Sequence, residues 1–362
     1  MKRILVMLVL ALLNLSPALA EDGEMDGDAV YTLVDQSGRE LTMRAGRMFE
    51  GDEYISSDDQ LYRVVSVDDQ RMIATAEHLG YAETDPAAAT AFASLIARAE
   101  SKKKISMYST HSDESYVPTD GDSSKLKNAG IYDVGDALKE NFEKLGIEVE
   151  YSKDTFLPHD AGAYRRSRRT AEELLKETPD ALLDIHRDAV PAKQYETEVE
   201  GEDTSKVRLF VGRSNPNGDE NRAFARQIKA VADKQYPGLV KDIFIGKGNY
   251  NQELYPRALL LEMGTHEIEK EKAISSTQYI AEVINEVLYG GTAKAEASSG
   301  RQAKTVSSGI IWVIGAVIVA AVVYALASSG KLKDIWPKVK RSTSEITGGI
   351  VGDKPEKKAG KK

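Results

Sequence analysis

Three residues that can bind metal or transfer protons each lie at or just beyond the end of a predicted strand. They are His111, His186 and Glu262, and three leucines stand immediately before Glu262. A carboxylate in such apolar surroundings costs free energy unless it is paired, ligated or used in acid–base chemistry. Imidazole nitrogens and a carboxylate oxygen are ligands that suit Zn²⁺, with water in the fourth position of a catalytic site.

These residue types predict hydrolysis of an amide. A bound zinc ion lowers the pKa of its water towards ~7 and polarises a carbonyl oxygen. A second carboxylate then takes the proton of the water and passes it to the leaving amine. The sequence contains no H-E-x-x-H helix motif. A structural role remains the alternative for each histidine taken alone, whereas the three residues together favour a metal site.

The absence of cysteine narrows the chemistry further. The chain has 362 residues, no cysteine and five histidines. Disulfide scaffolds, thiolate zinc fingers, iron–sulfur clusters and cysteine nucleophiles are therefore excluded. Any transition metal must be held by His, Asp or Glu.

Residues 104–290 alternate between strand and helix patterns, which indicates an α/β fold with a parallel or mixed sheet flanked by helices. Functional groups in such sheets gather at the carboxyl ends of strands, where His111, His186 and Glu262 are expected. Strands are predicted at 105–108, 147–151, 181–185, 207–211, 243–245 and 259–261, and helices at 134–145, 164–176, 221–235 and 269–288.

Residues 28–80 predict a small N-terminal β domain. Short β patterns alternate with turn clusters about every ten residues, which is typical of a small antiparallel barrel or sandwich. We identify no catalytic grouping in this domain and interpret it as an adapter, joined by a linker at 82–103. Residues 21–100 carry 18 acidic and 6 basic side chains, and the whole chain has a net charge of −9. This acidic body argues against nucleic acid as the main partner.

The two ends of the sequence indicate export and membrane attachment. Residues 1–20 have a basic start, a short apolar run and a small-residue cleavage site, so we predict a signal peptide, with an uncleaved anchor as the alternative. Residues 309–328 are apolar and flanked by aromatic residues, which predicts a transmembrane helix after a flexible tether at 291–308. The basic tail at 329–362 is expected in the cytoplasm. The chain is thus predicted to be a single-pass membrane protein with an extracytoplasmic body.

Several short strings resemble those of the stage II sporulation protein P family, in the same order along residues 104–290. They are T-H-S-D-E-S-Y at 110–116, V-G at 134–135, D-I-H-R-D-A at 184–189, Y-N-Q at 250–252 and L-E-M-G at 261–264. The resemblance implies a zinc amidase-like fold and zinc-dependent N-acetylmuramoyl-L-alanine amidase activity on peptidoglycan, together with endopeptidase activity on crosslinked stem peptides. It also implies septal wall thinning and engulfment alongside the stage II sporulation proteins D and M.

The resemblance also assigns roles to individual residues. It implies that His111 and His186 are zinc ligands and that Glu262 is the catalytic carboxylate. It makes Glu114 the best candidate for the third ligand, although Asp113 is adjacent and Glu114 could instead support a ligand from behind.

Four further residues receive roles in substrate binding. Arg187 and Asp188 are expected to orient the segment around His186 or to bind a substrate carboxylate. Asn251 and Gln252 are expected to donate hydrogen bonds to peptide amides or accept them.

Two features depart from the family pattern. Family members are commonly anchored by an N-terminal transmembrane segment, whereas the strong anchor of this sequence is C-terminal. The β domain at 28–80 is also not required by the catalytic motif. A non-catalytic peptidoglycan-binding scaffold on an amidase-like fold is the alternative function, and the complete set of His and Glu residues favours the enzyme.

Overall fold

The computed structural model describes residues 29–82 and 103–290. The predicted signal peptide, tether, transmembrane helix and basic tail lie outside the described residues, as does nearly all of the predicted linker. Among the helices of the two described ranges, none combines the length and the apolar character that crossing a membrane requires.

The described elements follow the predicted alternation. The strands are β1 (Val30–Asp35), β2 (Glu40–Ala45), β3 (Glu53–Ile55), β4 (Gln60–Asp68), β5 (Ile73–Tyr81), β6 (Lys104–Tyr108), β7 (Glu148–Tyr151), β8 (Ala181–Asp188), β9 (Glu196–Val199), β10 (Glu202–Ser205), β11 (Val207–Gly212), β12 (Val240–Gly246) and β13 (Ala258–Thr265). The helices are α3 (Val117–Asp120), α4 (Gly130–Lys144), α5 (Ala163–Leu175), α6 (Gly218–Gln235) and α7 (Lys270–Tyr289), with single 3₁₀ turns at Ala192–Gln194 and Gln252–Leu254.

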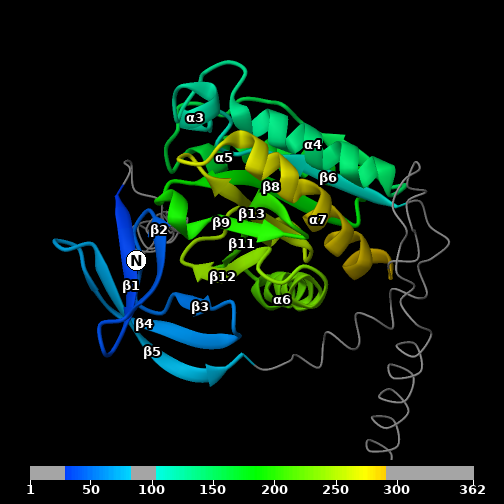
Figure 1. Ribbon diagram of the computed structural model, residues 1–362. Coiled ribbons are helices and arrows are strands. Elements are labelled where there is room, and N and C mark those ends of the chain that lie inside the picture. Colours follow the sequence, from blue (N-terminus) through cyan, green and yellow to red (C-terminus); the bar gives the residue numbers. More distant parts are fainter. Residues whose placement is uncertain (1–28, 83–102, 291–362) are drawn as a thin grey trace, which may run out of the picture. The chain divides into compact units, whose positions relative to one another are not determined.

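Eleven of these strands form one mixed sheet, in the order β2-β1-β5-β4-β3-β12-β11-β13-β8-β6-β7 (Figure 1). Strands β7, β6, β8 and β13 pair parallel with one another, whereas β13 pairs antiparallel with β11 on its other side. The prediction of a mixed sheet flanked by helices is thereby confirmed. The remaining two strands, β9 and β10, form a separate hairpin.

The two faces of the sheet are covered differently. Apolar residues of α4, α6 and α7 form one core with alternate residues of the central strands, such as Leu183, Leu209 and Leu261. On the opposite face, α5 packs against β6 and β8 through Ala171 and Leu174. Side chains alternate between faces along a strand, so Asp184 and His186 of β8 lie on the α5 face. The polar residues of interest therefore lie away from the larger helical layer.

The N-terminal strands differ from the separate antiparallel barrel or sandwich that the sequence predicted. Strand β1 pairs parallel with β5, and β3 pairs antiparallel with β12, so these strands extend the main sheet. Tyr31 and Leu33 of β1 share an apolar cluster with Phe210, Phe244 and Leu260 of the central strands. The physical reason is that β12 would otherwise expose an edge of unpaired peptide groups, which β3 covers.

Candidate metal centre and catalytic site

The structure brings His111, His186 and Glu262 to one cavity of about 340 Å³. His186 and Glu262 stand directly opposite each other on the paired strands β8 and β13. His111 lies in the segment after β6, which pairs with β8 on its other side. Both β8 and β13 run further than predicted, so His186 and Glu262 lie within strands rather than just beyond them.

His111, Glu114 and His186 form a group whose ligand atoms all lie within 4.8 Å of one another, and all three side chains are buried. The Oε1 atom of Glu114 is 3.3 Å from Nδ1 of His111 and 3.4 Å from Nδ1 of His186. Metal–ligand bonds of 2.0–2.1 Å at tetrahedral angles place neighbouring ligand atoms roughly 3.3–3.4 Å apart. The donor set and the two distances from Glu114 to the imidazoles therefore fit a tetrahedral metal ion.

Glu114 is held in place for this role. Its second oxygen, Oε2, accepts a 2.8 Å hydrogen bond from the peptide N–H of Arg187. Burial opposes ionisation of Glu114, but the fields and hydrogen bonds of His186 and His111 outweigh it and hold the pKa of Glu114 well below its usual range. Glu114 thus presents an ionised oxygen to the two imidazoles, as a metal ligand must.

Asp184 supports His186 from behind, and the sequence analysis gave it no role. Its Oδ1 lies 3.0 Å from Nε2 of His186 and also accepts a 2.8 Å hydrogen bond from the peptide N–H of Thr110. A carboxylate behind a ligand histidine fixes the orientation of the ring. Burial acts to lower the pKa of His186, but Asp184 and Glu114 raise it well above its ordinary value. The signal that could have found Asp184 is its position two residues before His186, on the same strand face.

Glu262 is suited to proton transfer. It is half-buried, and its Oε2 has no hydrogen-bond partner among the described residues. Burial raises the pKa of this carboxyl to about 8, with a further contribution from the nearby charge of Asp188. The chain bulges directly after it, between Glu262 and Thr265, where Gly264 adopts a φ of +83°. A side chain at Gly264 would collide with Ile268, so the L-E-M-G string includes the glycine that the bulge requires.

Comparison with known proteins identifies the family of this chain. The model of stage II sporulation protein P matches residues 43–285. The chain belongs to that family.

The stage II sporulation protein P of Bacillus subtilis (strain 168) is 30% identical over 222 residues, which are 56% of this chain and 55% of that protein. The chain spans about half the length of this curated relative. Among solved structures, an N-acetylmuramoyl-L-alanine amidase from Clostridium difficile 630 matches with a TM-score of 0.35 and 14% identity, over 52% of this chain and 96% of its own. The CwlD amidase from Clostridioides difficile, solved in complex with the GerS lipoprotein, matches with a TM-score of 0.34 and 12% identity, over 52% of this chain and 96% of its own.

The match to stage II sporulation protein P begins within β2. Strands β3, β4 and β5 therefore lie inside the family match, although the sequence analysis set them apart from the catalytic motif. Arg44, Ala45 and Gly46, which follow one another at the end of β2, line the same cavity as the metal group. The N-terminal strands of this family member thus form part of the site wall, which the interpretation as an adapter did not anticipate.

Arg187 and Asp188 are both buried and bound to other parts of the protein. The guanidinium of Arg187 donates to the carbonyl oxygens of Ser115 and Ser123, which fixes the segment that carries Glu114. Asp188 accepts hydrogen bonds from the hydroxyl of Tyr195 and from other donors around it. Of the two predicted roles, these contacts match the orientation of the segment around His186. Both residues also line the cavity.

Asn251 and Gln252 do not lie along the cavity, which differs from their predicted contact with substrate. The amide of Asn251 donates to the carbonyl oxygen of Tyr164 at 3.0 Å. The amide of Gln252 accepts from the peptide N–H of Gly212 and donates to the carbonyl oxygen of Phe210. These side chains are committed to backbone partners, and they position the turn that carries Tyr250, which does line the cavity.

His159 is a further residue that lines the cavity. Its ring stacks on His111 with centroids 4.0 Å apart and planes at 24°. Its Nδ1 lies 3.0 Å from Oδ1 of Asp113, and Asp113 also accepts from the hydroxyl of Ser124. Asp113 is therefore engaged with His159 and Ser124, whereas Glu114 faces both imidazoles.

Proposed function

We propose that this member of the stage II sporulation protein P family is a zinc-dependent peptidoglycan hydrolase that cleaves the N-acetylmuramoyl-L-alanine amide bond. Stem-peptide crosslinks are a second candidate substrate. The observation that carries the proposal is the grouping of His111, Glu114 and His186, with ligand atoms within 4.8 Å, beside Glu262 in one cavity. Two imidazoles and a carboxylate, with room for a fourth ligand, are the donor set of catalytic zinc sites.

A zinc ion held by this group would supply a Lewis acid that polarises the scissile carbonyl and acidifies a water molecule. Glu262 would accept a proton from the attacking water and deliver it to the amine nitrogen as the carbon–nitrogen bond breaks. A group that performs both steps works best with a pKa near the operating pH, and burial raises the pKa of Glu262 to about 8. The products would be the muramoyl carboxylic acid and a free peptide amine.

The remaining residues hold these groups in register. The peptide N–H of Arg187 and the carboxylate of Asp184 fix Glu114 and His186 respectively. The neighbouring strands β8 and β13 hold Glu262 opposite His186. Tyr164 and Tyr250, both buried, support this part of the cavity wall.

We further propose that the catalytic body acts outside the cell membrane, tethered by the helix predicted at 309–328, in wall remodelling at the sporulation septum. Stage II sporulation proteins D and M would be its partners. This part of the proposal rests on the sequence alone, through the predicted signal at 1–20, the apolar segment and the resemblance to the family.

Mass spectrometry of digested peptidoglycan, with zinc added or removed, tests the hydrolase. Free stem peptides would identify amidase cleavage, and halved crosslinks would identify endopeptidase cleavage. General acid–base groups contribute about 10²–10⁴-fold to rate, so Glu262→Gln is expected to lose that much while still binding zinc. The control is Glu173→Gln, because Glu173 is exposed on α5 and paired with Arg169. Peptidoglycan binding without zinc binding or cleavage would refute the enzyme and support the scaffold alternative.

A further inference from the structure

The end of strand β2 places an arginine in the wall of the catalytic cavity. Arg44 lines the cavity together with the metal group, yet its side chain is only 4% exposed. Nη1 donates a 2.6 Å hydrogen bond to the carbonyl oxygen of Arg47, and Nη2 donates a long one, of 3.4 Å, to the hydroxyl of Tyr250. The guanidinium lies over the rings of Phe210 and Phe244, 5.0 and 5.3 Å from their centroids. Arg44 is therefore a fixed cation on an aromatic support, with its small exposed part in the cavity.

A continuous series of ring contacts connects this cation with the metal group. Tyr164 stacks on His186, with ring centroids 6.2 Å apart and planes at 12°. Tyr250 meets Tyr164 edge-on at 5.1 Å and meets Phe210 at 4.8 Å. Phe210 in turn lies under Arg44. Tyr164, Tyr250 and Phe210 are buried behind the wall of the cavity that Arg44 and the metal group share, so a substrate in this cavity can reach both the metal group and the arginine.

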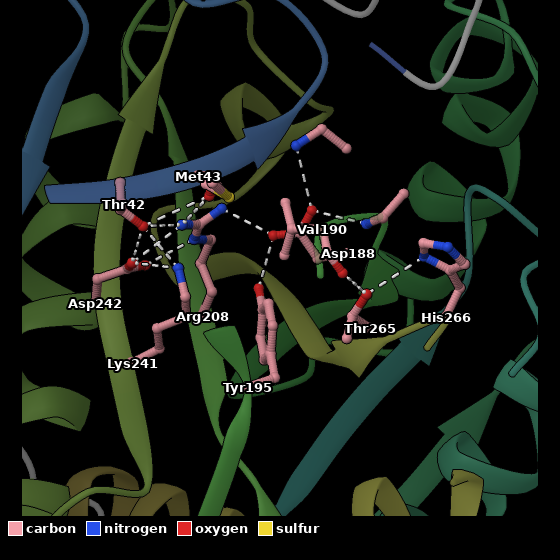
Figure 2. Close-up of polar contacts among 12 residues, drawn as sticks. Thr42, Met43, Asp188, Val190, Tyr195, Arg208, Lys241, Asp242, Thr265 and His266 are labelled. Atoms are coloured by element: carbon pink, nitrogen blue, oxygen red, sulfur yellow. Dashed lines mark hydrogen bonds and ion pairs between the residues drawn. The ribbon is translucent and has the colours of Figure 1, made fainter. Parts of the chain in front are cut away.

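The neighbouring Arg208 holds the strand that carries Arg44. Its guanidinium, only 1% exposed, pairs with Asp242 at 2.7 Å and with Asp188 at 2.9 Å. It also donates to the hydroxyl of Thr42 and to the carbonyl oxygen of Met43, both at 2.8 Å and both on β2 (Figure 2). Arg208 is thus committed to protein partners, and it fixes β2 one and two residues before Arg44.

A buried guanidinium in the wall of a cavity favours one class of ligand group. Its planar fork matches the two oxygens of a carboxylate, and hydrogen bonds between ionised groups are about twice as strong as neutral ones. The substrate side of the proposed reaction is a peptide, which can carry such a carboxylate next to the bond that is cut. A carboxamide of the same shape would lose the charge and one acceptor.

We propose that Arg44 is a specificity-determining residue, which binds a carboxylate of the substrate peptide and so selects acidic over amidated peptides. This inference rests on the proposed function. It makes the N-terminal strands part of substrate recognition.

The test uses the full chain and two synthetic muramoyl peptides that differ in one group. The residue after the alanine carries a free carboxylate in one peptide and a carboxamide in the other. Wild-type protein is expected to prefer the acid in kcat/KM. Arg44→Gln is expected to lower kcat/KM for the acid about 10- to 100-fold more than for the amide, the effect of one hydrogen bond to a charged group. Arg44→Lys retains the charge without the fork and should lie between.

The matched control is Arg71→Gln, because Arg71 is an exposed arginine in the turn between β4 and β5, outside the cavity; it should leave the acid-to-amide ratio unchanged. A general loss of structure would lower both rates together, so only a collapse of the ratio supports the inference. Equal loss for both peptides, or no preference in the wild type, would overturn it. Calorimetry on metal-free protein separates the two proposals. If both peptides bind equally well, the proposed role of Arg44 is refuted, even when the protein hydrolyses peptidoglycan. If the acid binds more tightly but the zinc-loaded protein does not hydrolyse it, only the proposed hydrolase function is refuted.

Discussion

Replacing Asp184 by Asn should weaken zinc binding without removing a ligand. Oδ1 of Asp184 lies 3.0 Å from Nε2 of His186 and accepts from the peptide N–H of Thr110, while Oδ2 accepts from the Thr110 hydroxyl at 2.7 Å. An asparagine has the same shape but only one acceptor oxygen. Its NH₂ group must therefore face a donor on one side, either the hydroxyl or the peptide N–H of Thr110.

The magnitude follows from these contacts. Loss of a carboxylate behind a ligand histidine typically lowers metal affinity about 10- to 100-fold, or about 1.4–2.7 kcal/mol. A second effect has the opposite sign. Asp184 raises the pKa of His186, so Asp184→Asn lets His186 release its proton at lower pH and reduces the competition between proton and metal. The loss should therefore be largest in alkaline buffer, where His186 is deprotonated in both proteins.

Competition with a chromophoric chelator measures this affinity in the full chain. The control is Asp136→Asn, because Asp136 is an exposed carboxylate on α4 that pairs with Lys153. Wild type and control should bind alike, and Asp184→Asn should bind more weakly. If Asp184→Asn bound zinc as tightly as wild type in alkaline buffer, while His186→Ala lost it, the proposed support of His186 by Asp184 would be wrong.

Two further predictions concern stability. Burial raises the pKa of Glu262 to about 8, so metal-free folded protein binds more protons than the unfolded chain between its ordinary pKa of 4.5 and that value. The free energy of unfolding should therefore fall as pH rises through this window, relative to Glu262→Gln, in urea titrations; parallel pH profiles would contradict this. Arg208→Met would leave the buried carboxylate of Asp188 without its cation and would leave Asp242 with Lys241 alone; breaking a buried ion pair typically costs about 3–5 kcal/mol. Urea unfolding should show a lower midpoint for this variant. An unchanged midpoint would contradict the inference that the ion pairs of Arg208 with Asp188 and Asp242 stabilise the fold.

The sequence by itself determined the strands of the central sheet and three residues of the site, His111, His186 and Glu262. Strands such as β8 and β13 are buried along most of their length, so their apolar runs were readable without knowledge of their neighbours. The same runs made His186 and Glu262 conspicuous, because each interrupts an apolar strand. Period and polarity are local properties, and a sequence carries them directly.

The tertiary structure decided which oxygen joins the two imidazoles and which strands enclose the cavity. Glu114 could be distinguished from Asp113 only by where the side chains point, and Asp184 gained a role only from its distance to His186. The N-terminal strands became part of the site because Arg208 reaches Thr42, 166 residues earlier in the chain. Contacts of this kind depend on how distant segments pair in space. The residues around Arg208 and around Thr42 show no local sequence pattern from which the contact could be predicted.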